Sequence, residues 1–349
     1  MRLRFWRTGR STPTTTSSLI HSSPMYGSPA LDSLEDAGLR YCEDVLAVPL
    51  SEGTYATYRG GLVDSKIAEL VPEAVHFDGT STQEPPDRDW IARLPAADRL
   101  LGTWLYGGLL FDDFPHFMLE GLGRLWAANR CGLEGTRLAF FAPWGVPDSL
   151  SPTNFVNQAL RGFNIDPKRI VIIDQPVQFQ GMIIPVQQYG YQIASSPDAS
   201  MLSFLRSFRV PSGISHSFNE KIYVSRFRLP ANRGRPVAEH VLEDLLRRNG
   251  YSIFHPEEHD LYTQISVYSS AKKLIFCDGG AVHGCILLPD LKADVAVVAR
   301  RRDPRWDGSE IGDQFRGFGN SSCGLIRSST STNSVWKPGK PFRFWTGVQ

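Results

Sequence analysis

The sequence has few cysteines, and none of them forms a CxxC pair. The five cysteines are scattered and odd in number, so neither a disulfide framework nor a zinc site is indicated. We therefore expect a reducing, cytoplasmic location and no metal site. The cysteines are Cys42, Cys131, Cys277, Cys285 and Cys323.

The start of the chain lacks a long apolar run. Residues 1–23 are basic and rich in Ser and Thr, without the apolar core of a signal peptide or membrane anchor. We expect residues 1–40 to form a flexible tail that does not direct secretion. Arginines around Phe5 and Trp6 could touch an anionic membrane surface, although a solvated end is the simpler interpretation. These arginines are Arg2, Arg4, Arg7 and Arg10.

The sequence also lacks an excess of charge of one sign. Lys and Arg number 37 against 36 Asp and Glu, a net charge of +1, which argues against nucleic-acid binding. Any anion must be bound locally. Hydrophobic residues at 42% and charged residues at 21% are ordinary for a globular protein, and 349 residues are long for one core. We therefore expect two domains.

The N-terminal domain is expected over residues 41–213, with α/β character. Apolar residues recur at steps of three and four over residues 114–128, which predicts an amphipathic helix. A Pro-Ser-Gly break at 211–213 gives the domain boundary. Further strands are expected at residues 137–142, 169–174 and 181–186, and further helices at 154–163 and 201–208.

The C-terminal domain, residues 214–300, shows a regular alternation of strands and helices. Such alternation predicts βαβ crossovers and a parallel, Rossmann-like sheet. Residues 301–349 are polar and poorly patterned, and we expect an irregular tail. The expected strands are 221–225, 251–254, 273–276 and 294–298, and the expected helices are 237–248, 261–271 and 281–288.

A glycine pair follows the third of these strands, in the run Cys277-Asp278-Gly279-Gly280-Ala281-Val282-His283. Ligands bind at the carboxyl ends of parallel strands. Glycines let backbone N–H groups approach a ligand, and the start of the next helix attracts an anion such as a diphosphate. A tight turn with no ligand is the competing interpretation of a lone glycine pair.

A basic stretch leaves the first strand of the same domain. It would direct one or two guanidinium groups at the same crevice, where arginine binds phosphate oxygens bidentately. We expect at least two of the four arginines to be solvated surface residues. They are Arg226, Arg228, Arg233 and Arg235.

Two blocks of the sequence resemble glycosyltransferase family 61, also called the capsular polysaccharide biosynthesis group. The run from Ser225 to Pro289 is similar to the C-terminal signature of the family, and GGLLFDDFPHFMLEGLGRLWA is similar to its N-terminal motif. The matching positions are Ser225, Arg226, Arg235, Glu239, Gly250, Tyr251, Gln264, Gly280 and Ala281 in the first block, and Asp113, His116, Glu120 and Arg124 in the second.

The resemblance implies an α/β fold of the GT-B kind, with two Rossmann-like lobes whose parallel sheets face a cleft. It also implies an inverting transfer from a nucleotide-sugar donor, without metal or other cofactor, to a glycan or lipid-linked acceptor in capsule or exopolysaccharide synthesis. The sequence departs from the family pattern at Ala238, where the family has Asn, at Gly279, where it has His, and near Ala299, where an acidic residue is common.

The resemblance and the chemistry of sugar transfer together suggest roles for these residues. His116 is the candidate base, Glu120 its orienting partner or the base itself, and Asp113 is grouped with them as catalytic. A packed histidine, and an ion pair of Glu120 with Arg124, are the structural alternatives. The expected donor-binding residues are Arg226 and Arg235 on the diphosphate, Glu239 on ribose or the helix dipole, Gln264, and the turn of Gly279, Gly280, Ala281 and His283.

Three rival interpretations remain open. The triplet Asp87-Arg88-Asp89 matches the Asp-x-Asp signature of metal-dependent sugar transferases, but it lies in a proline-rich loop and we read it as chance. A catalytically inert family member could bind a glycan or nucleotide. A two-lobed pyruvyl transferase-like enzyme would use phosphoenolpyruvate as its donor.

Overall fold

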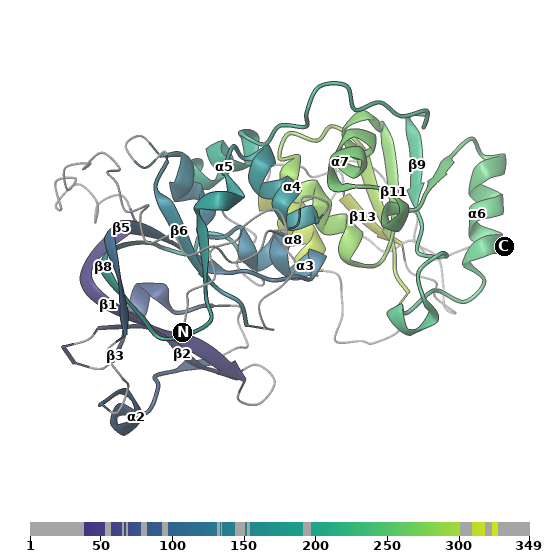
Figure 1. Ribbon diagram of the computed structural model, residues 1–349. Coiled ribbons are helices and arrows are strands. Elements are labelled where there is room, and N and C mark those ends of the chain that lie inside the picture. Colours follow the sequence, from purple (N-terminus) through teal and green to yellow (C-terminus); the bar gives the residue numbers. More distant parts are fainter. Residues whose placement is uncertain are drawn as a thin grey trace, which may run out of the picture. The chain divides into compact units, whose positions relative to one another are not determined.

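The computed structural model describes most of the chain between residues 38 and 326, and groups it into two compact units (Figure 1). Most of the expected N-terminal tail, including the arginines around Phe5 and Trp6, lies outside the described residues. The described ranges are 38–52, 57–64, 66–67, 69–77, 82–92, 97–130, 133, 135–143, 151, 154–190, 197–300, 309–317 and 323–326.

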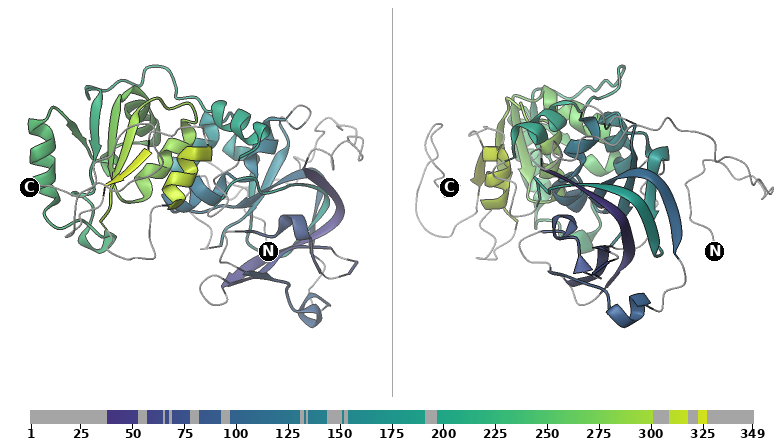
Figure 2. Two further views of the ribbon diagram at one scale, coloured as in Figure 1. Left: turned by 180° about the vertical axis from the view of Figure 1, so that it is seen from behind. Right: turned by 90° about the vertical axis from the view of Figure 1, so that its left-hand side faces the viewer.

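Unit 1 contains an eight-stranded sheet over the described residues, with the strand order β3-β2-β1-β8-β5-β6-β7 and β4 paired to β2. Its long strands curve together, as the right-hand view of Figure 2 shows. The strands are β1 (Leu39–Glu52), β2 (Thr57–Asp64), β3 (Glu69–Leu70), β4 (Thr82–Glu84), β5 (Asp98–Leu109), β6 (Arg137–Phe141), β7 (Ile170–Ile173) and β8 (Val177–Pro185).

The sheet of unit 1 is mixed, so the expectation of a parallel Rossmann-like lobe is wrong for this part of the chain. Strand β1 pairs antiparallel with both β2 and β8, whereas β8, β5, β6 and β7 are parallel to one another. The antiparallel part comes from residues 39–64, where the sequence alternates too weakly to predict strands. Short helical segments complete the unit: η1 (Pro72–Ala74), α2 (Arg88–Ala92), η3 (Leu125–Asn129) and η5 (Pro167–Arg169).

Unit 2 contains a five-stranded, fully parallel sheet with the order β10-β9-β11-β12-β13 (Figures 1 and 2), which confirms the prediction for the C-terminal half. In chain order this is 2-1-3-4-5, a doubly wound arrangement whose switch point lies between β9 and β11. The elements are β9 (Lys221–Val224), η6 (Ala231–Arg233), α6 (Glu239–Arg248), β10 (Ser252–Phe254), η7 (Pro256–Glu258), α7 (Leu261–Ser270), β11 (Lys273–Cys277), η8 (Gly280–Leu287), β12 (Asp294–Val298), α8 (Ser309–Gly317) and β13 (Cys323–Ile326).

Two elements of unit 2 come from the segment expected to be an irregular tail. Helix α8 and strand β13 lie within residues 301–349, and β13 extends the parallel sheet beyond β12. The prediction for this segment is therefore wrong over these residues. Its remaining residues, like Cys131, lie outside the described part of the chain.

Unit 2 also takes three segments from the N-terminal half, so its limits differ from the single boundary expected near residue 213. These segments pack on the C-terminal elements: the Gln158 side chain accepts a hydrogen bond from the Leu261 backbone N–H, and its carbonyl accepts one from the Tyr262 hydroxyl. The segments carry α3 (Phe114–His116), η2 (Phe117–Gly121), α4 (Phe155–Gly162) and α5 (Ala199–Arg206).

The helix expected over residues 114–128 is broken into three short pieces. A single α-helical turn at α3 leads into the π-helical turn η2, and the 3-10 helix η3 follows after a short break. Gly121 and Gly123 in this stretch favour the interruption, because glycine weakens a helix interior. In the described part of the chain, no helix combines the length and apolar character needed to cross a bilayer.

Candidate functional site

The turn after β11 lies at the switch point of the unit 2 sheet, and Arg226, which follows β9, packs directly against it. A Cβ atom added to Gly279 would lie 2.0 Å from Nη1 of Arg226, so only glycine leaves room for the guanidinium. The Gly279 backbone is extended, with a φ of 164°, so conformation does not require glycine here. The arginine therefore occupies the space that a side chain at position 279, such as the family's histidine, would fill.

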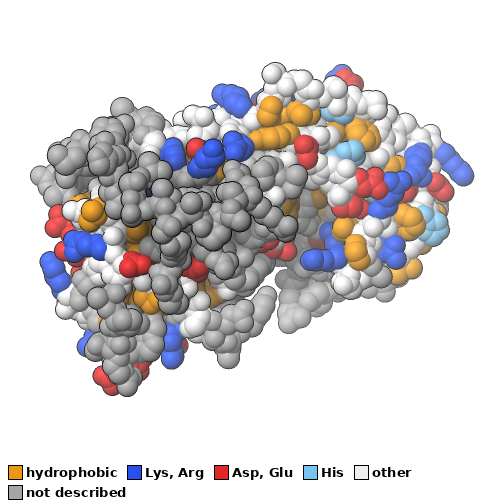
Figure 3. Space-filling model, in the orientation of Figure 1, with side chains coloured by type: hydrophobic (Ala, Val, Ile, Leu, Met, Phe, Trp, Pro, Cys, Tyr) orange, Lys and Arg blue, Asp and Glu red, His pale blue; other side chains and the backbone are white. Residues whose placement is uncertain are grey.

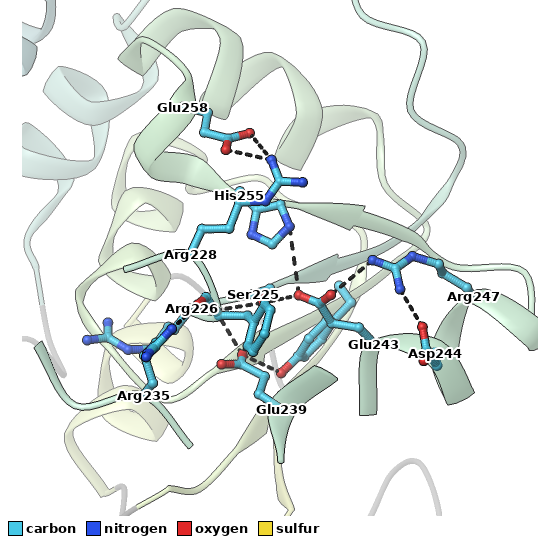
Figure 4. Close-up of polar contacts among 12 residues, drawn as sticks. Ser225, Arg226, Arg228, Arg235, Glu239, Glu243, Asp244, Arg247, His255 and Glu258 are labelled. Atoms are coloured by element: carbon cyan, nitrogen blue, oxygen red, sulfur yellow. Dashed lines mark hydrogen bonds and ion pairs between the residues drawn. The ribbon is translucent and has the colours of Figure 1, made fainter. Parts of the chain in front are cut away.

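A buried carboxylate holds the start of the Arg226 loop in place (Figure 4). Oε1 of Glu239 accepts hydrogen bonds from the Arg226 backbone N–H at 2.8 Å, the Tyr223 hydroxyl at 2.9 Å and the Ser225 hydroxyl at 3.2 Å. Burial raises the pKa of Tyr223, so its hydroxyl keeps the proton that it donates. Glu239 is only 2% exposed. These contacts give Glu239 a supporting role in the Arg226 loop, and its contact with ribose stays a prediction.

The Ser225 hydroxyl also links this loop to a second buried carboxylate. It lies 2.7 Å from Oε1 of Glu243, which in turn lies 3.7 Å from Nε2 of the buried His255. Arg247 donates to the other oxygen of Glu243 at 2.9 Å. Figure 4 shows these side chains as one connected polar network behind the Arg226 loop.

Arg300 brings a second guanidinium to the same turn, and sequence analysis missed it. Its Nε donates to the Asp278 carbonyl at 3.0 Å and lies 4.0 Å from the Asp278 carboxylate. A Cβ atom at Gly234 would lie 2.6 Å from its Nη1. Arg300 follows β12 by two residues, so the rule that singled out Arg226, position at the carboxyl end of a parallel strand, could have found it.

The guanidinium groups of Arg226 and Arg300 contact adjacent residues of the same two loops. Arg226 contacts Gly279 and donates to the Arg233 carbonyl at 2.5 Å, while Arg300 contacts Asp278 and Gly234. Nε of Arg226 is buried and has no hydrogen-bond partner. Two cationic side chains therefore contact adjacent residues of one turn, an arrangement that favours a negatively charged ligand there.

Two of the predicted donor-binding residues have other contacts. Arg235 donates to the Phe227 carbonyl at 3.0 Å and lies over the Phe227 ring, rather than against Gly279. The Gln264 amide nitrogen donates to the carbonyl oxygens of Pro256 and His259, so it holds the loop after β10. The prediction that Arg235 and Gln264 meet the glycine turn therefore finds no contact in the described part of the chain.

His116 and Glu120 belong to the same unit as the glycine turn, although about 160 residues separate them in sequence. A Cβ atom at Gly280 would lie 2.9 Å from Cδ of Pro115, the neighbour of His116, so α3 packs closely on the start of η8. Nδ1 of His116 lies 2.6 Å from Oε1 of Glu120, one turn further along. Glu120 is buried, whereas 43% of the His116 side chain is exposed. The pair therefore lies beside the turn with its imidazole accessible.

Asp113, the third predicted catalytic residue, stands at the start of α3. Its backbone carbonyl accepts from the Phe117 N–H at 2.9 Å, while its side chain makes no capping hydrogen bond. Oδ1 of Asp113 is buried without a hydrogen-bond partner. The structure places Asp113 next to the His116 turn but shows no contact between Asp113 and the glycine turn in the described residues.

His283 and Ala281 lie within η8, and His283 has a structural partner. Its Nδ1 lies 2.8 Å from Oε1 of Gln314 in α8. Burial, with a smaller contribution from the nearby His116, lowers the pKa of His283 to about 4. This neutral, partly buried imidazole joins η8 to α8, and the role of His283 in binding the donor stays a prediction.

Arg124, from the N-terminal motif, belongs to unit 1 and supports its backbone. It donates to the carbonyl oxygens of Glu73 at 2.6 Å, Val75 at 2.8 Å and Pro185. Burial lowers the pKa of this arginine, since a charged guanidinium is costly to desolvate. The alternative that Glu120 pairs with Arg124 is therefore wrong, because Glu120 lies on His116.

Comparison with known protein families finds one family that matches most of both sequence blocks in a single range. The profile of the Glycosyltransferase 61 family matches residues 114–295, just over half of the chain, and confirms the resemblance. The matched range begins in α3 and ends in β12, so it includes His116, Glu120, Arg226 and Gly279 but not Arg300. No curated protein matches the chain.

Proposed function

Since the chain belongs to glycosyltransferase family 61, we propose that it transfers a sugar from a nucleotide-sugar donor to a glycan or lipid-linked acceptor, with inversion and without a metal ion. One observation carries this proposal. The contact of Pro115 with Gly280 brings the His116–Glu120 pair beside the turn that Arg226 and Arg300 both contact. A proton acceptor and an anion site within one unit are the two parts that the reaction needs.

The His116–Glu120 pair supplies the base in this proposal. Because Nδ1 of His116 faces the Glu120 carboxylate, Nε2 is the nitrogen that takes the proton of the acceptor hydroxyl. The hydroxyl oxygen then bonds to the anomeric carbon while the bond from that carbon to the diphosphate oxygen breaks. The carboxylate of Glu120 stabilises the imidazolium that forms.

Arg226 and Arg300 supply the positive charge for the leaving group. The departing nucleoside diphosphate gains negative charge as the glycosidic bond breaks, and two fixed guanidinium groups stabilise it where a metal ion would otherwise be needed. The backbone of the Gly279 turn adds N–H donors at the same place. We place the reaction in the assembly of a cell-surface polysaccharide on the cytoplasmic side of a membrane.

The base is tested by turnover measurements on His116→Ala and Glu120→Gln, with His240→Ala on the exposed part of α6 as the matched control. General-base catalysis contributes about 100- to 10,000-fold, so kcat should fall by about that factor in His116→Ala and less in Glu120→Gln. The dissociation constant of the nucleoside diphosphate should stay unchanged in both. Wild-type turnover in folded His116→Ala would rule out the assignment.

The anion site is tested by calorimetric titration of UDP, GDP, ADP and CMP into Arg226→Ala and Arg300→Ala. Each charge-assisted hydrogen bond contributes about 1.5–3 kcal/mol, so each variant should bind the preferred nucleotide about 10- to 100-fold more weakly. Arg88→Ala, which removes an exposed ion pair in unit 1, is the control. Unchanged affinity in both site variants would refute the role of the turn.

The reaction class is tested by incubating the protein with a panel of nucleotide sugars and a panel of glycan acceptors. Release of nucleoside diphosphate with formation of a longer glycan would support the proposal. Nucleotide binding without turnover of any donor would identify an inert family member. Consumption of phosphoenolpyruvate instead of a nucleotide sugar would identify a pyruvyl transferase.

A further inference from the structure

Unit 2 has a hollow along β10, at the edge of its sheet, which the proposed reaction does not use. It is an open groove of about 480 Å³, in the size range of small-ligand sites. We propose that this groove, which we call the β10 groove, binds a neutral stretch of a glycan chain. Only the identity of this glycan, as the acceptor or the product of the transfer, rests on the proposed function. The groove is lined by Ser217, Phe218, Arg228, Arg247, Tyr251, Ser252, Ile253, His255, Glu258 and His259.

The charges in the β10 groove are balanced, which argues for a neutral ligand. Arg228 donates to both carboxylate oxygens of Glu258, at 2.5 and 2.7 Å. Arg247 lies between Glu243 at 2.9 Å and Asp244 at 2.7 Å. Figure 3 shows acidic and basic side chains side by side over this part of unit 2, rather than a field of one sign. The glycine turn differs, because Arg226 forms no ion pair there among the described residues and Arg300 lies 4.0 Å from its carboxylate.

The walls of the groove combine rings with polar edges, which suits a sugar. The His259 ring stacks on Phe254 with centroids 4.8 Å apart, and the Phe218 ring meets His259 edge-on at 5.9 Å. Tyr251 adds a third ring. Aromatic faces pack against the C–H groups of a sugar, while fixed guanidinium and carboxylate groups donate to and accept from its hydroxyls.

The floor of the β10 groove contains a buried polar atom that lacks a partner. His255 is 6% exposed, and its Nδ1 makes no hydrogen bond, although Nε2 faces Glu243 at 3.7 Å. Figure 4 shows the ring between Glu243 and the pair of Arg228 with Glu258. A buried polar atom without a partner is costly, and a hydroxyl in the groove would complete its hydrogen bonding.

Saturation-transfer NMR on the full chain tests the proposal with three neutral hexasaccharides, built from xylose, glucose and N-acetylglucosamine, and one anionic probe, hexagalacturonate. At least one neutral probe should show transfer from the protein. Tyr251→Ala and His255→Ala should weaken its binding at least tenfold. The control Tyr262→Phe removes a hydroxyl outside the groove and should not. Because His255→Ala could disturb folding, the surface variant Tyr251→Ala decides the outcome.

The nucleoside diphosphate titration separates this inference from the proposed function. Both groove variants should keep wild-type affinity for the nucleotide, and Arg226→Ala should keep wild-type affinity for the neutral glycan. The inference is overturned if no neutral probe binds, if Tyr251→Ala binds it as well as wild type, or if hexagalacturonate binds tighter. Loss of nucleotide affinity in Tyr251→Ala would also overturn it, since the groove would then belong to the donor.

Discussion

At the scale of single residues, Gly279 and Gly280 are glycines for two different reasons. The space beside Gly279 is filled by the Arg226 guanidinium, and the space beside Gly280 by the Pro115 ring. In the proposed function, Gly279 therefore serves the anion site and Gly280 the position of His116. Because the neighbours differ, substitution at each position should affect a different step of the reaction.

Gly279→Ala should weaken binding of the nucleoside diphosphate about tenfold, which corresponds to about 1.4 kcal/mol, with little change in kcat. The added methyl would displace the end of a flexible arginine, so the free energy of unfolding should change by less than about 0.5 kcal/mol. Calorimetric titration and urea unfolding measure the two quantities. Unchanged nucleotide affinity would show that Arg226 does not bind the ligand from this position.

Gly280→Ala should instead lower kcat, because a methyl 2.9 Å from Pro115 Cδ must move the α3 turn that carries His116. A misplacement of a catalytic group by about 1 Å can cost about 100-fold in rate. Steady-state kinetics at saturating donor measures it, with nucleotide affinity as the internal control. Equal loss of nucleotide affinity in Gly279→Ala and Gly280→Ala would contradict this division of roles.

The departure from the family pattern at Ala238 lies at a position with left-handed backbone. Ala238 precedes α6 with a φ of 58° and a ψ of 27°, in the left-handed region that asparagine tolerates better than alanine. An asparagine here would suit the backbone, so its absence from this chain does not by itself indicate lost activity.

Ala238→Asn should raise the free energy of unfolding by about 0.5–1 kcal/mol, because it relieves left-handed strain. The opposite substitution, asparagine to alanine, can be made just after α4, where Asn164 has a φ of 61°. Asn164→Ala should lower stability by a similar amount. Urea unfolding of both variants checks the pair, and a destabilised Ala238→Asn would contradict the explanation.

At the scale of elements, η8 is fixed to α8 by a neutral histidine, which makes this junction sensitive to acid. The folded pKa of His283 is about 4, below its ordinary value of 6.5. The unfolded chain therefore binds more protons between these values, so stability is fully present above pH 6.5 and is lost as pH falls toward 4.

A His283→Gln variant should show a weaker loss of unfolding free energy between pH 6.5 and 4 than the wild-type protein. Denaturant unfolding at half-unit steps of pH gives both curves, and their difference isolates the imidazole from other titrating groups. Parallel curves would show that the folded protein accepts the proton on His283 without cost.

The sequence predicted the elements of unit 2 closely and those of unit 1 poorly. Strands β9, β11 and β12 are short, apolar and bounded by clear stops, so periodicity identifies them. Strand β1 contains Glu43, Asp44 and Glu52 and a left-handed residue at Asp44, features that hide an antiparallel strand from any local pattern. Its order in the sheet depends on pairing with β8, more than a hundred residues away.

The candidate site was predicted in composition but not in detail. Strand ends singled out Arg226 and the glycine turn, and family resemblance singled out His116 and Glu120. Sequence could not show that Glu239 and His283 turn inward, because burial depends on neighbours from distant segments such as Tyr223 and Gln314. Arg300 follows the last predicted strand, at the point where the alternation of strands and helices in the sequence ends.

At the scale of the whole molecule, the chain passes between the two units several times. Unit 2 needs residues 113–120 and 151–164 as well as its C-terminal sheet. Phe114 and Phe117 both meet Phe155 edge-on, at 5.3 and 5.8 Å, and Phe163 stacks on Phe204 at 4.1 Å. A cut at the expected boundary would remove these rings from the unit.

A fragment of residues 214–349 should therefore fail to fold cooperatively, even though it holds the whole parallel sheet. It would expose the apolar surfaces of α7 and η8 and leave the Leu261 N–H without the Gln158 side chain. Thermal unfolding followed by circular dichroism, and amide dispersion in NMR spectra, compare it with the full chain. A sharp transition and a dispersed spectrum would instead support an independent domain at residue 214.

The shared location of His116 and Gly280 in unit 2 bears on how substrates reach the site. Both belong to one compact unit, so the spacing between the proposed base and the proposed anion site is set within unit 2. Unit 1 could thus differ between proteins with different acceptors while the proposed base and anion site stayed the same.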